Sequence, residues 1–514
     1  MAMPCEEEEA QRATATATLT FVSTRRTSCT YLRCVMRSEQ CKLLLSPDPQ
    51  TQASLVAIRR WIKNRGRNVS IRTLMQLHGN TIRRLCPCML MSPMSVAQYL
   101  PIENAPFNLV LFDEASQIPT AEAVGAIARA NAAIIVGDPK QMPPTTFFQR
   151  EINTDDDVEH NDMESILDDC ITLGMPEHYL NYHYRSRHES LIAFSNRYYY
   201  GNHLITFPSA DDREIHICYR NVHGIYDYSR TRTNRIEAEA IVNEVIRRLK
   251  DPMHSGQSIG VIAFSTVQQN LIDELLQERI GRNQQLLKAA YGEEQTEPLF
   301  VKNLENVQGD ERDVILFSVC YGPSEDGKIS MNFGPLNNAG GERRLNVAVT
   351  RARQEMVVFS SMTSEDIDLE KSNALGVQGL KNFLYYAENG QLPEDAETPC
   401  NTTVNQLADH LATDLRKAGY QVDVNVGRSD FRVDVAVLDT NRPGTYRLGL
   451  LFDGRGYYRT PMMRDRELVQ PTVLEHLGWN LARIWQEDYF LHQEEVTNEV
   501  LERLLCPPEK PVDR

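Results

Sequence analysis

The distribution of apolar positions predicts two α/β units along the chain. Short apolar runs alternate with amphipathic segments, which is the pattern of a parallel sheet covered by helices. In the first unit we predict strands at residues 109–112 and 132–136 around a helix at 121–129. In the second unit we predict strands at 260–264, 314–319 and 356–360, with helices at 236–249 and 268–279.

A third unit has a different order, with a helix followed by several strands. The pattern predicts a helix at 404–418, strands at 420–426, 431–438 and 446–452, and a helix at 467–477. A helical pattern also begins near residue 54, whereas residues 1–50 show no sustained period and are interpreted as an atypical or disordered segment. The predicted division is 1–50, 51–150, a linker at 151–175, 176–395, 396–505 and a tail at 506–514.

Composition narrows the class of protein. A chain of 514 residues is long enough for about three domains. The net charge of −16 argues against a general polyanion-binding surface but leaves room for a local basic channel. Apolar runs are too short to cross a membrane, and an acidic run at 6–9 is unlike a signal peptide. The odd number of cysteines, 11, favours reduced thiols in the cytoplasm or nucleus.

The first predicted strand ends in two carboxylates, Asp113 and Glu114. In an ATPase this placement lets Asp113 hold Mg²⁺ and lets Glu114 orient or deprotonate the attacking water. The plainer interpretation is two carboxylates in a loop. The next strand ends in GDPKQMPPT, and its Gln141 is expected beside the same nucleotide pocket, where an amide can both donate and accept.

Five motifs in order extend this interpretation: LVLFDEASQ, VGDPKQMPPT, LNYHYRSRHESL, VQGDERDVI and RRLNVAVTRAR. Together they resemble superfamily 1 helicases of the branch typified by the nonsense-mediated-decay helicase, over residues 88–361. The resemblance implies the C-terminal part of a first RecA-like domain, a complete second RecA-like (P-loop NTPase-like) domain, and binding of single-stranded DNA or RNA.

The resemblance also implies roles for individual residues. Arg185 matches the arginine that reaches the third phosphate of ATP, and Arg351 matches the arginine finger, with Arg353 two residues beyond. Gln308, Gly309 and Glu311 match the motif that couples the nucleotide to the nucleic-acid strand. The plainer interpretation of both Arg185 and Arg351 is surface ion pairing. Residues 91–100 resemble a strand-contacting motif of the first domain.

One family motif has no counterpart in this sequence. No G-x-x-x-x-G-K followed by Ser or Thr, the loop that cradles phosphates, occurs in the 514 residues. We therefore expect this chain alone to hydrolyse ATP poorly or not at all. An upstream segment or a partner chain is expected to supply the loop.

The third unit carries FRVDVAVLD, YRLGLLFDGRGYY, RDRE and LGWNLARIWQEDY. These resemble the very-short-patch-repair-like endonuclease domains of the PD-(D/E)xK fold, over residues 398–495. Asp434 and Asp453 match carboxylates that hold a divalent metal in such nucleases. Leu451 stands where the family has an acid, and no early-helix Glu matches, because Asn405 and Gln406 occupy that region. This departure favours a nucleic-acid-binding or scaffolding domain over an active nuclease.

Basic and aromatic side chains of the third unit allow two interpretations. Arg464, Arg466 and Arg483 would contact phosphates while Tyr457 or Tyr458 stacks on a base, or the arginines would pair with Asp465, Glu467 and Asp488. We predict that Trp479 and Trp485 are core residues.

Two functions from different classes remain. The first is the C-terminal portion of an ATP-dependent DNA or RNA helicase with an appended nuclease-like domain. The second is a non-catalytic nucleic-acid-binding or scaffolding protein derived from such an enzyme. A truncated gene would make the first true of the full protein and the second true of this chain.

Overall fold

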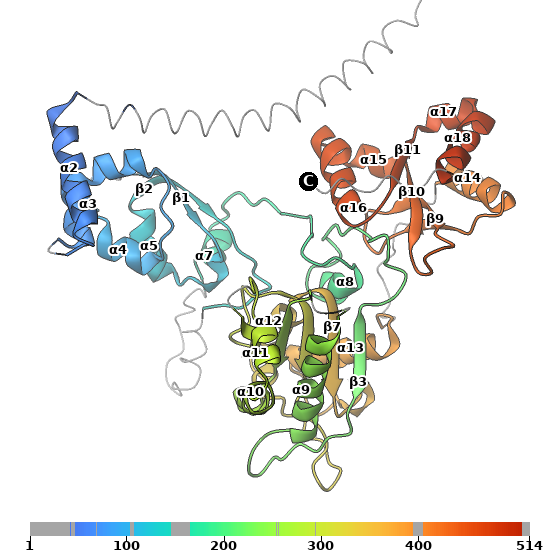
Figure 1. Ribbon diagram of the computed structural model, residues 1–514, viewed down its shortest axis with the longest axis horizontal. Coiled ribbons are helices and arrows are strands. Elements are labelled where there is room, and N and C mark those ends of the chain that lie inside the picture. Colours follow the sequence, from blue (N-terminus) through green and yellow to red (C-terminus); the bar gives the residue numbers. More distant parts are fainter. Residues whose placement is uncertain are drawn as a thin grey trace, which may run out of the picture. The chain divides into compact units, whose positions relative to one another are not determined.

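A computed structural model describes residues 47–102, 107–144, 165–393 and 405–505, apart from Asn68, Met253, Ser255, Glu293 and Glu294, and also Lys42 (Figure 1). The chain divides into two compact units, one of residues 1–139 with 143–177 and one of residues 140–142 with 178–514. The predictions for residues 1–41 and for the tail at 506–514 lie outside the described residues.

The first unit contains a two-stranded parallel sheet with Phe112 paired to Ile135. Asp48 begins the first described helix by accepting from the amide of Thr51 at 2.9 Å. One face of the sheet packs on helices, but Leu109, Leu111 and Ile134 are exposed on the described strands. The elements are α2 (Pro49–Lys63), α3 (Ile71–Leu85), α4 (Pro93–Tyr99), β1 (Phe107–Phe112), η1 (Ala115–Gln117), α5 (Thr120–Ile127), β2 (Ala130–Ile135) and α7 (Ile166–Thr172).

Helix α7 falls within the segment predicted as a linker. Ser165 caps it by accepting from the amide of Asp168 at 3.2 Å, and Ile166, Leu167 and Cys170 are buried in the core of the first unit. Residues 166–172 are thus part of the first unit, because three apolar positions on one short helix cover α5 and the sheet. The acidic part of the predicted linker, 151–164, is outside the described residues.

The second unit begins with a five-stranded parallel sheet in the order β3-β7-β6-β4-β5. Buried residues of α9, α10 and α11 cover one face, and those of α8, α12 and α13 cover the other. The elements are α8 (Ser190–Tyr198), β3 (Ile217–Asn221), α9 (Arg235–Lys250), β4 (Ile259–Ala263), α10 (Thr266–Ile280), α11 (Gln284–Tyr291), β5 (Phe300–Asn303), β6 (Arg312–Ser318), η2 (Gly334–Asn337), α12 (Gly341–Val349), β7 (Ala352–Ser360), η3 (Ser364–Asp366) and α13 (Leu375–Asn389).

The same unit contains a mixed four-stranded sheet in the order β11-β10-β9-β8. β10 is parallel to β11 and antiparallel to β9. The elements are α14 (Gln406–Lys417), β8 (Val422–Val426), β9 (Val433–Leu438), β10 (Tyr446–Phe452), α15 (Arg455–Arg459), η4 (Asp465–Val469), α16 (Gln470–His476), β11 (Leu481–Ile484), α17 (Gln486–Leu491) and α18 (Gln493–Leu505). This agrees with the predicted restriction-endonuclease-like α/β domain.

The segment between α8 and β3 packs against one face of this mixed sheet. Phe207 and Ala210 share a buried apolar cluster with residues of β9, β10 and α16. The amide of Ala210 donates to the carbonyl of Leu477 at 3.1 Å, and Trp479 Nε1 donates to the carbonyl of Pro208 at 2.8 Å. We call residues 205–210 the docking segment. Through it, the nuclease-like domain is held by both apolar packing and hydrogen bonds.

Among the helices that the structure describes, none is long and apolar enough to cross a membrane.

Candidate functional site

In the second unit, two predicted arginines meet on one predicted carboxylate. Glu311, in the loop before β6, accepts from Arg185 Nε at 2.7 Å and lies 3.5 Å from Arg353 NH1. Arg353 also contacts Asp313 at 3.1 Å and pairs with Glu297. The carboxylate of Glu297, with that of Asp313, raises the pKa of Arg353, so this guanidinium stays charged. Three segments far apart in sequence therefore form one polar cluster.

His183 lies near both Arg185 and Arg351. The imidazole is partly buried, and its Nε2 accepts from the amide of Ser186 at 3.2 Å. Burial, followed by the positive charges of Arg185 and Arg351, lowers the pKa of His183 to about 3, so the ring is neutral at physiological pH. Sequence reasoning missed His183, although it lies inside the HYRSR motif.

Arg351 is engaged with its own helix in this structure. It is 2% exposed, its Nε donates to the carbonyl of Val347 at 2.7 Å, and its NH2 donates to Thr350 Oγ1 at 2.9 Å. The amide of Arg187 donates to the carbonyl of Arg353 at 2.7 Å, which ties the HYRSR turn to the start of β7. An arginine finger at position 351 would have to exchange these contacts for a phosphate oxygen.

Gln308 and Gly309 lie in the loop between β5 and β6. Gly309 has φ +82°, a left-handed conformation that favours glycine, and open space lies where a Cβ would stand. Lys302 of β5 pairs with Asp310 of this loop. The loop thus has its own ion pair and turn, which bring Glu311 to the arginines.

Gln141 groups with the second unit rather than the first. The carbonyl of Lys140 accepts from Asn346 Nδ2 of α12 at 2.9 Å, and Met142 is buried in the core of the second unit. The VGDPKQMPPT motif is therefore shared between the units. The predicted position of Gln141 beside Asp113 and Glu114 stays a prediction.

Asp113 and Glu114 form an exposed turn after β1 in the first unit. Glu114 has φ 53° and ψ 40°, its amide donates to Asp113 Oδ1 at 3.0 Å, and its Oε2 accepts from Gln117 Nε2 at 3.3 Å. A Cβ on Gly137 would lie 2.9 Å from the amide nitrogen of Ser116. Because only glycine permits this approach, the GDP turn and the DEAS turn lie together, as expected for the ends of adjacent parallel strands.

In the nuclease-like domain, Asp434 and Asp453 are linked through the end of β10. Asp434 Oδ2 accepts from the amide of Phe452 at 2.7 Å, and burial raises the pKa of Asp434 to about 6. Asp453 Oδ1 accepts from the amide of Gln486 at 2.6 Å, and its Oδ2 accepts from the Tyr458 hydroxyl at 3.2 Å. A pocket of about 400 Å³ is lined by Asp453, Gly454, Arg455, Tyr458, Arg459 and Gln486.

Known protein families match both the helicase-like and the nuclease-like parts of the chain. One AAA-domain family matches residues 89–149 and another matches residues 163–363. The REase_MTES_1575 family matches residues 408–504. An uncharacterized ATP-dependent helicase of Mycoplasma genitalium, MG140, is 35% identical over 446 residues, which cover 81% of this chain and 38% of that protein.

The chain contains superfamily 1 helicase domains. The MG140 homologue of Mycoplasma pneumoniae is 34% identical to this chain over 446 residues, covering 80% of this chain and 38% of that protein. Human senataxin, described as a probable helicase, is 25% identical over 287 residues, covering 50% of this chain and 10% of that protein. The chain thus spans little more than a third of the length of the two mycoplasma helicases.

In the nuclease-like domain, the side chain at position 451 packs in an apolar core. Leu451 is buried and belongs to the same apolar cluster as Phe207 of the docking segment and Trp479. The side chain of Asn405, where an early acid was sought, lies close enough to Asp434 to lower its pKa, although burial outweighs this effect. Among the described residues, no group of three acidic side chains suited to a metal gathers in this domain.

The two tryptophans of this domain differ. Trp479 is 4% exposed and stacks on Tyr446, so the prediction of a core residue is confirmed. Trp485 is 45% exposed, so the same prediction is wrong. Its place at the end of β11, before α17, leaves it beside the arginines instead, with the Arg483 guanidinium 6.0 Å from its ring.

Arg466 and Arg483 lie on the ring of Tyr457, with guanidinium carbons 4.6 and 4.9 Å from its centroid. Within the described residues, no ion pair joins Arg464, Arg466 or Arg483 to Asp465, Glu467 or Asp488. The three arginines therefore do not form the predicted ion pairs with these acids. The cluster leaves cationic and aromatic groups together beside the Asp453 pocket.

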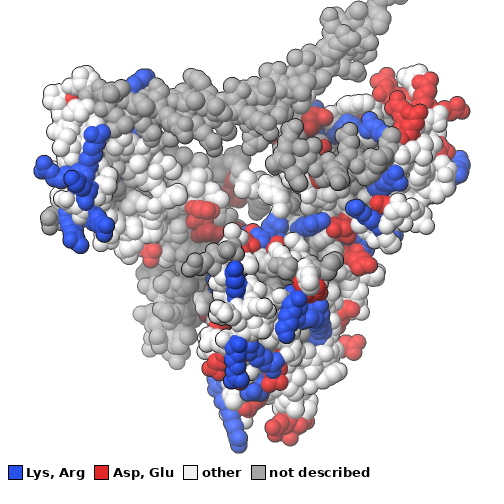
Figure 2. All heavy atoms as spheres, in the orientation of Figure 1, with Lys and Arg blue, Asp and Glu red and all other residues white. Residues whose placement is uncertain are grey.

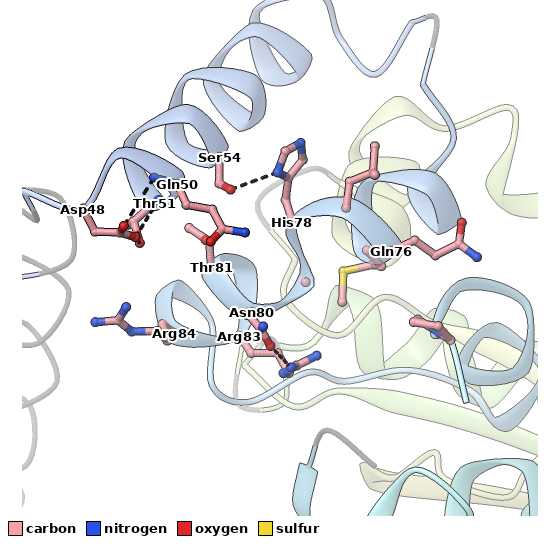
Figure 3. Close-up of a pocket in the computed structure, with 14 residues that line it drawn as sticks. Asp48, Gln50, Thr51, Ser54, Gln76, His78, Asn80, Thr81, Arg83 and Arg84 are labelled. Atoms are coloured by element: carbon pink, nitrogen blue, oxygen red, sulfur yellow. Dashed lines mark hydrogen bonds between the residues drawn. The ribbon is translucent and has the colours of Figure 1, made fainter. Parts of the chain in front are cut away.

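A second pocket lies between α2 and α3 in the first unit, with a volume of about 270 Å³. Figure 3 shows the hydrogen bond across it, between His78 Nδ1 and Ser54 Oγ at 3.0 Å. The guanidinium of Arg83 donates a hydrogen bond to the side-chain oxygen of Asn80 within the same pocket. Sequence reasoning assigned no role here.

Proposed function

We propose that this chain supplies the C-terminal portion of an ATP-dependent DNA or RNA helicase with an appended nuclease-like domain. The cluster of Arg185, Glu311 and Arg353, with Arg351 beside it through His183, is the observation that carries the proposal. Fixed guanidinium groups stabilise the negative charge that develops on phosphate oxygens during transfer. In this proposal Asp113 holds Mg²⁺ and Glu114 orients water when ATP is bound.

The nucleotide also needs a phosphate loop, which this sequence lacks. We therefore place the loop on an upstream segment or a partner chain. The exposed apolar face of β1 and β2 supports this, because Leu109 and Leu111 are 48% and 57% exposed although parallel sheets are normally covered on both faces. Further helices packed on this face would bury these side chains, and further strands at the edge of the sheet would bring the loop toward Asp113.

The test is ATP turnover by the purified 514-residue chain, with and without single-stranded DNA or RNA. We expect no turnover above that of a Glu114→Gln variant. Steady turnover that the variant abolishes would refute the need for another segment. Restored turnover on co-expression with the polypeptide encoded upstream would support the helicase proposal itself.

A basic surface on the first unit supports nucleic-acid binding. No Asp or Glu occurs between Asp48 and Glu103, whereas Lys and Arg recur along α2, α3 and their connection, at Arg59, Arg60, Lys63, Arg65, Arg67, Arg72, Arg83 and Arg84. Figure 2 shows basic side chains gathered at this end of the first unit. In a chain of net charge −16, such a surface is the local basic region that phosphate binding needs.

The second candidate function is non-catalytic, and Leu451 favours it for the nuclease-like domain. Leucine offers no oxygen to a hard cation, so two carboxylates, Asp434 and Asp453, remain. The Arg466–Tyr457–Arg483 cluster suits phosphate and base contacts without cleavage. Incubation of DNA with the chain and Mg²⁺ or Mn²⁺ should give no cleavage; cleavage abolished by Asp434→Ala would overturn this assignment.

A further inference from the structure

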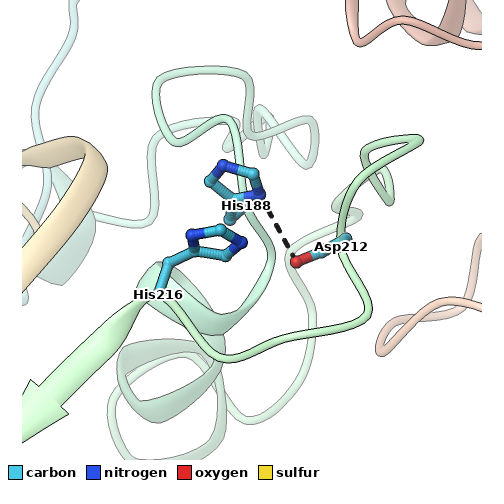
Figure 4. A group of neighbouring side chains, drawn as sticks. All are labelled: His188, Asp212 and His216. Carbon is cyan, nitrogen blue, oxygen red and sulfur yellow. Dashed lines mark ion pairs between the residues drawn. The ribbon is translucent and has the colours of Figure 1, made fainter. Parts of the chain in front are cut away.

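Three metal-ligating side chains meet at the start of the second unit, apart from the arginine cluster. His188 precedes α8, and Asp212 and His216 precede β3. Their ligand atoms lie within 4.8 Å of one another (Figure 4). The two imidazole rings are nearly parallel, with centroids 3.3 Å apart and an interplanar angle of 14°. Neither the helicase motifs nor the proposed function uses these residues.

Among the described residues, the three atoms that face one another make no hydrogen bond, although His188 Nδ1 and Asp212 Oδ1 lie at ion-pair distance, 3.5 Å apart. They are His188 Nδ1, Asp212 Oδ1 and His216 Nε2, and all three are buried. His188 is 4% exposed as a residue. An unpaired buried polar atom costs about 1–3 kcal/mol, and native proteins hold few of them. Three in one place therefore point to a shared ligand.

Neighbouring groups fix the orientation of the carboxylate. The amide of Glu189 donates to Asp212 Oδ2 at 3.1 Å, which leaves Oδ1 directed toward His188 Nδ1, 3.5 Å away. The hydroxyl of Ser190 accepts from the amide of His216 at 3.1 Å and holds the start of β3 against α8. Such outer hydrogen bonds are typical of metal sites, where they position the ligands.

A His–Asp ion pair is the simplest competing explanation. Protonated His188 would satisfy its own Nδ1 and Asp212 Oδ1, but it would leave His216 Nε2 buried without a partner. It would also place a charged ring directly on a second imidazole, because the two ring centroids are 3.3 Å apart. One cation accounts for all three atoms together.

We propose that His188 Nδ1, Asp212 Oδ1 and His216 Nε2 bind one divalent transition-metal ion, with zinc the expected occupant. Two imidazoles and one carboxylate suit Zn²⁺ better than Mg²⁺ or Ca²⁺, which prefer oxygen ligands. Because the rings are parallel, binding requires a rotation of the imidazoles that makes their lone pairs converge. A water molecule or Asp211, whose Oδ1 lies 4.0 Å from His188 Nδ1, completes the four ligands.

The site would be structural, since it ties α8 to β3 next to the docking segment. Asp212 lies two residues after Ala210. The backbone of Ala210 forms hydrogen bonds with the backbones of Leu477 and Tyr446 in the nuclease-like domain. The bound metal would therefore hold the turn from which that domain is docked.

The test uses the full chain, stripped of metal with a chelator and titrated with Co²⁺ and then Zn²⁺. We expect one Co²⁺ per chain with the visible absorption of a tetrahedral site, displaced by Zn²⁺, and a Zn²⁺-dependent rise in the melting temperature. His216→Ala should weaken binding by at least about tenfold. The matched control is His254→Ala, because His254 also pairs with an aspartate but belongs to no group of three possible ligands among the described residues.

Asp212→Asn serves as a second variant in case His216→Ala fails to fold. Its amide oxygen can still accept from the Glu189 amide, so the turn should keep that hydrogen bond. Folded wild-type protein that shows no stoichiometric Co²⁺ absorption would overturn the proposal. Absorption that survives unchanged in folded Asp212→Asn and His216→Ala would also overturn it, since the metal would then be elsewhere.

Discussion

Glu237 is a carboxyl group with no exposed surface in the second unit. It accepts from the Ser318 hydroxyl at 2.6 Å and from the amide of Cys320 at 2.7 Å, and burial raises its pKa to about 8. The folded protein therefore keeps a proton that the unfolded chain, with an ordinary pKa of 4.5, releases. Stability from this group falls as pH rises from about 4.5 to 8.

We predict that Glu237→Gln removes this pH dependence. The slope that disappears is at most about 1.4 kcal/mol of unfolding free energy per pH unit. Urea unfolding at several pH values between 5 and 8 measures it. Glu239→Gln on the same helix is the control, because Glu239 is half-exposed and pairs with Arg235. Equal slopes in wild type and Glu237→Gln would contradict the assigned pKa.

Motifs identified the arginines but not how they are held. Arg185, Glu311 and Arg353 each follow from a local sequence pattern, whereas their meeting brings Arg185 to two residues more than a hundred positions further along the chain. His183 and the group of His188, Asp212 and His216 were missed for the same reason. A histidine alone is uninformative until the fold shows which polar atoms surround it.

At the scale of elements, α2 and α3 present basic side chains in a stretch of sequence without Asp or Glu. We predict that replacing Arg59 and Arg60 together by Gln weakens binding of single-stranded DNA and RNA equally, because phosphate contacts carry no base information. The slope of log affinity against log salt should fall by about 0.7 for each phosphate that the variant no longer neutralises. Fluorescence anisotropy at several salt concentrations measures both quantities.

Arg235→Gln is the control for that experiment, since Arg235 is an exposed arginine of α9 in the second unit. An unchanged salt slope in the Arg59/Arg60 variant would exclude α2 from the nucleic-acid surface.

The central strands followed from sequence, whereas the edge strands did not. β4, β6 and β7 are interior strands with long apolar runs, and each was predicted. β3 and β5 lie at the two edges, are half-exposed and carry polar residues, so they lack that signal. Helix α7 was hidden within a polar segment for a similar reason, because only three of its side chains are buried.

At the scale of the whole molecule, Trp479 joins the nuclease-like domain to the docking segment. We predict that Trp479→Ala costs about 3–5 kcal/mol, since it removes a buried indole and the hydrogen bond to the Pro208 carbonyl. Limited proteolysis should then release the nuclease-like domain faster. The exposed Trp485, changed to Ala, should have little effect; equal release by both variants would contradict the role of Trp479.

The setting of Leu451 has a consequence for how this protein can change over time. An Asp or Glu at position 451 would place a charged group inside the buried apolar cluster that contains Phe207 and Trp479. A nuclease centre with an acid at this position would therefore require weaker packing between the docking segment and the nuclease-like domain. A carboxylate at position 451 and the packing of Phe207 with Trp479 would compete for the same space.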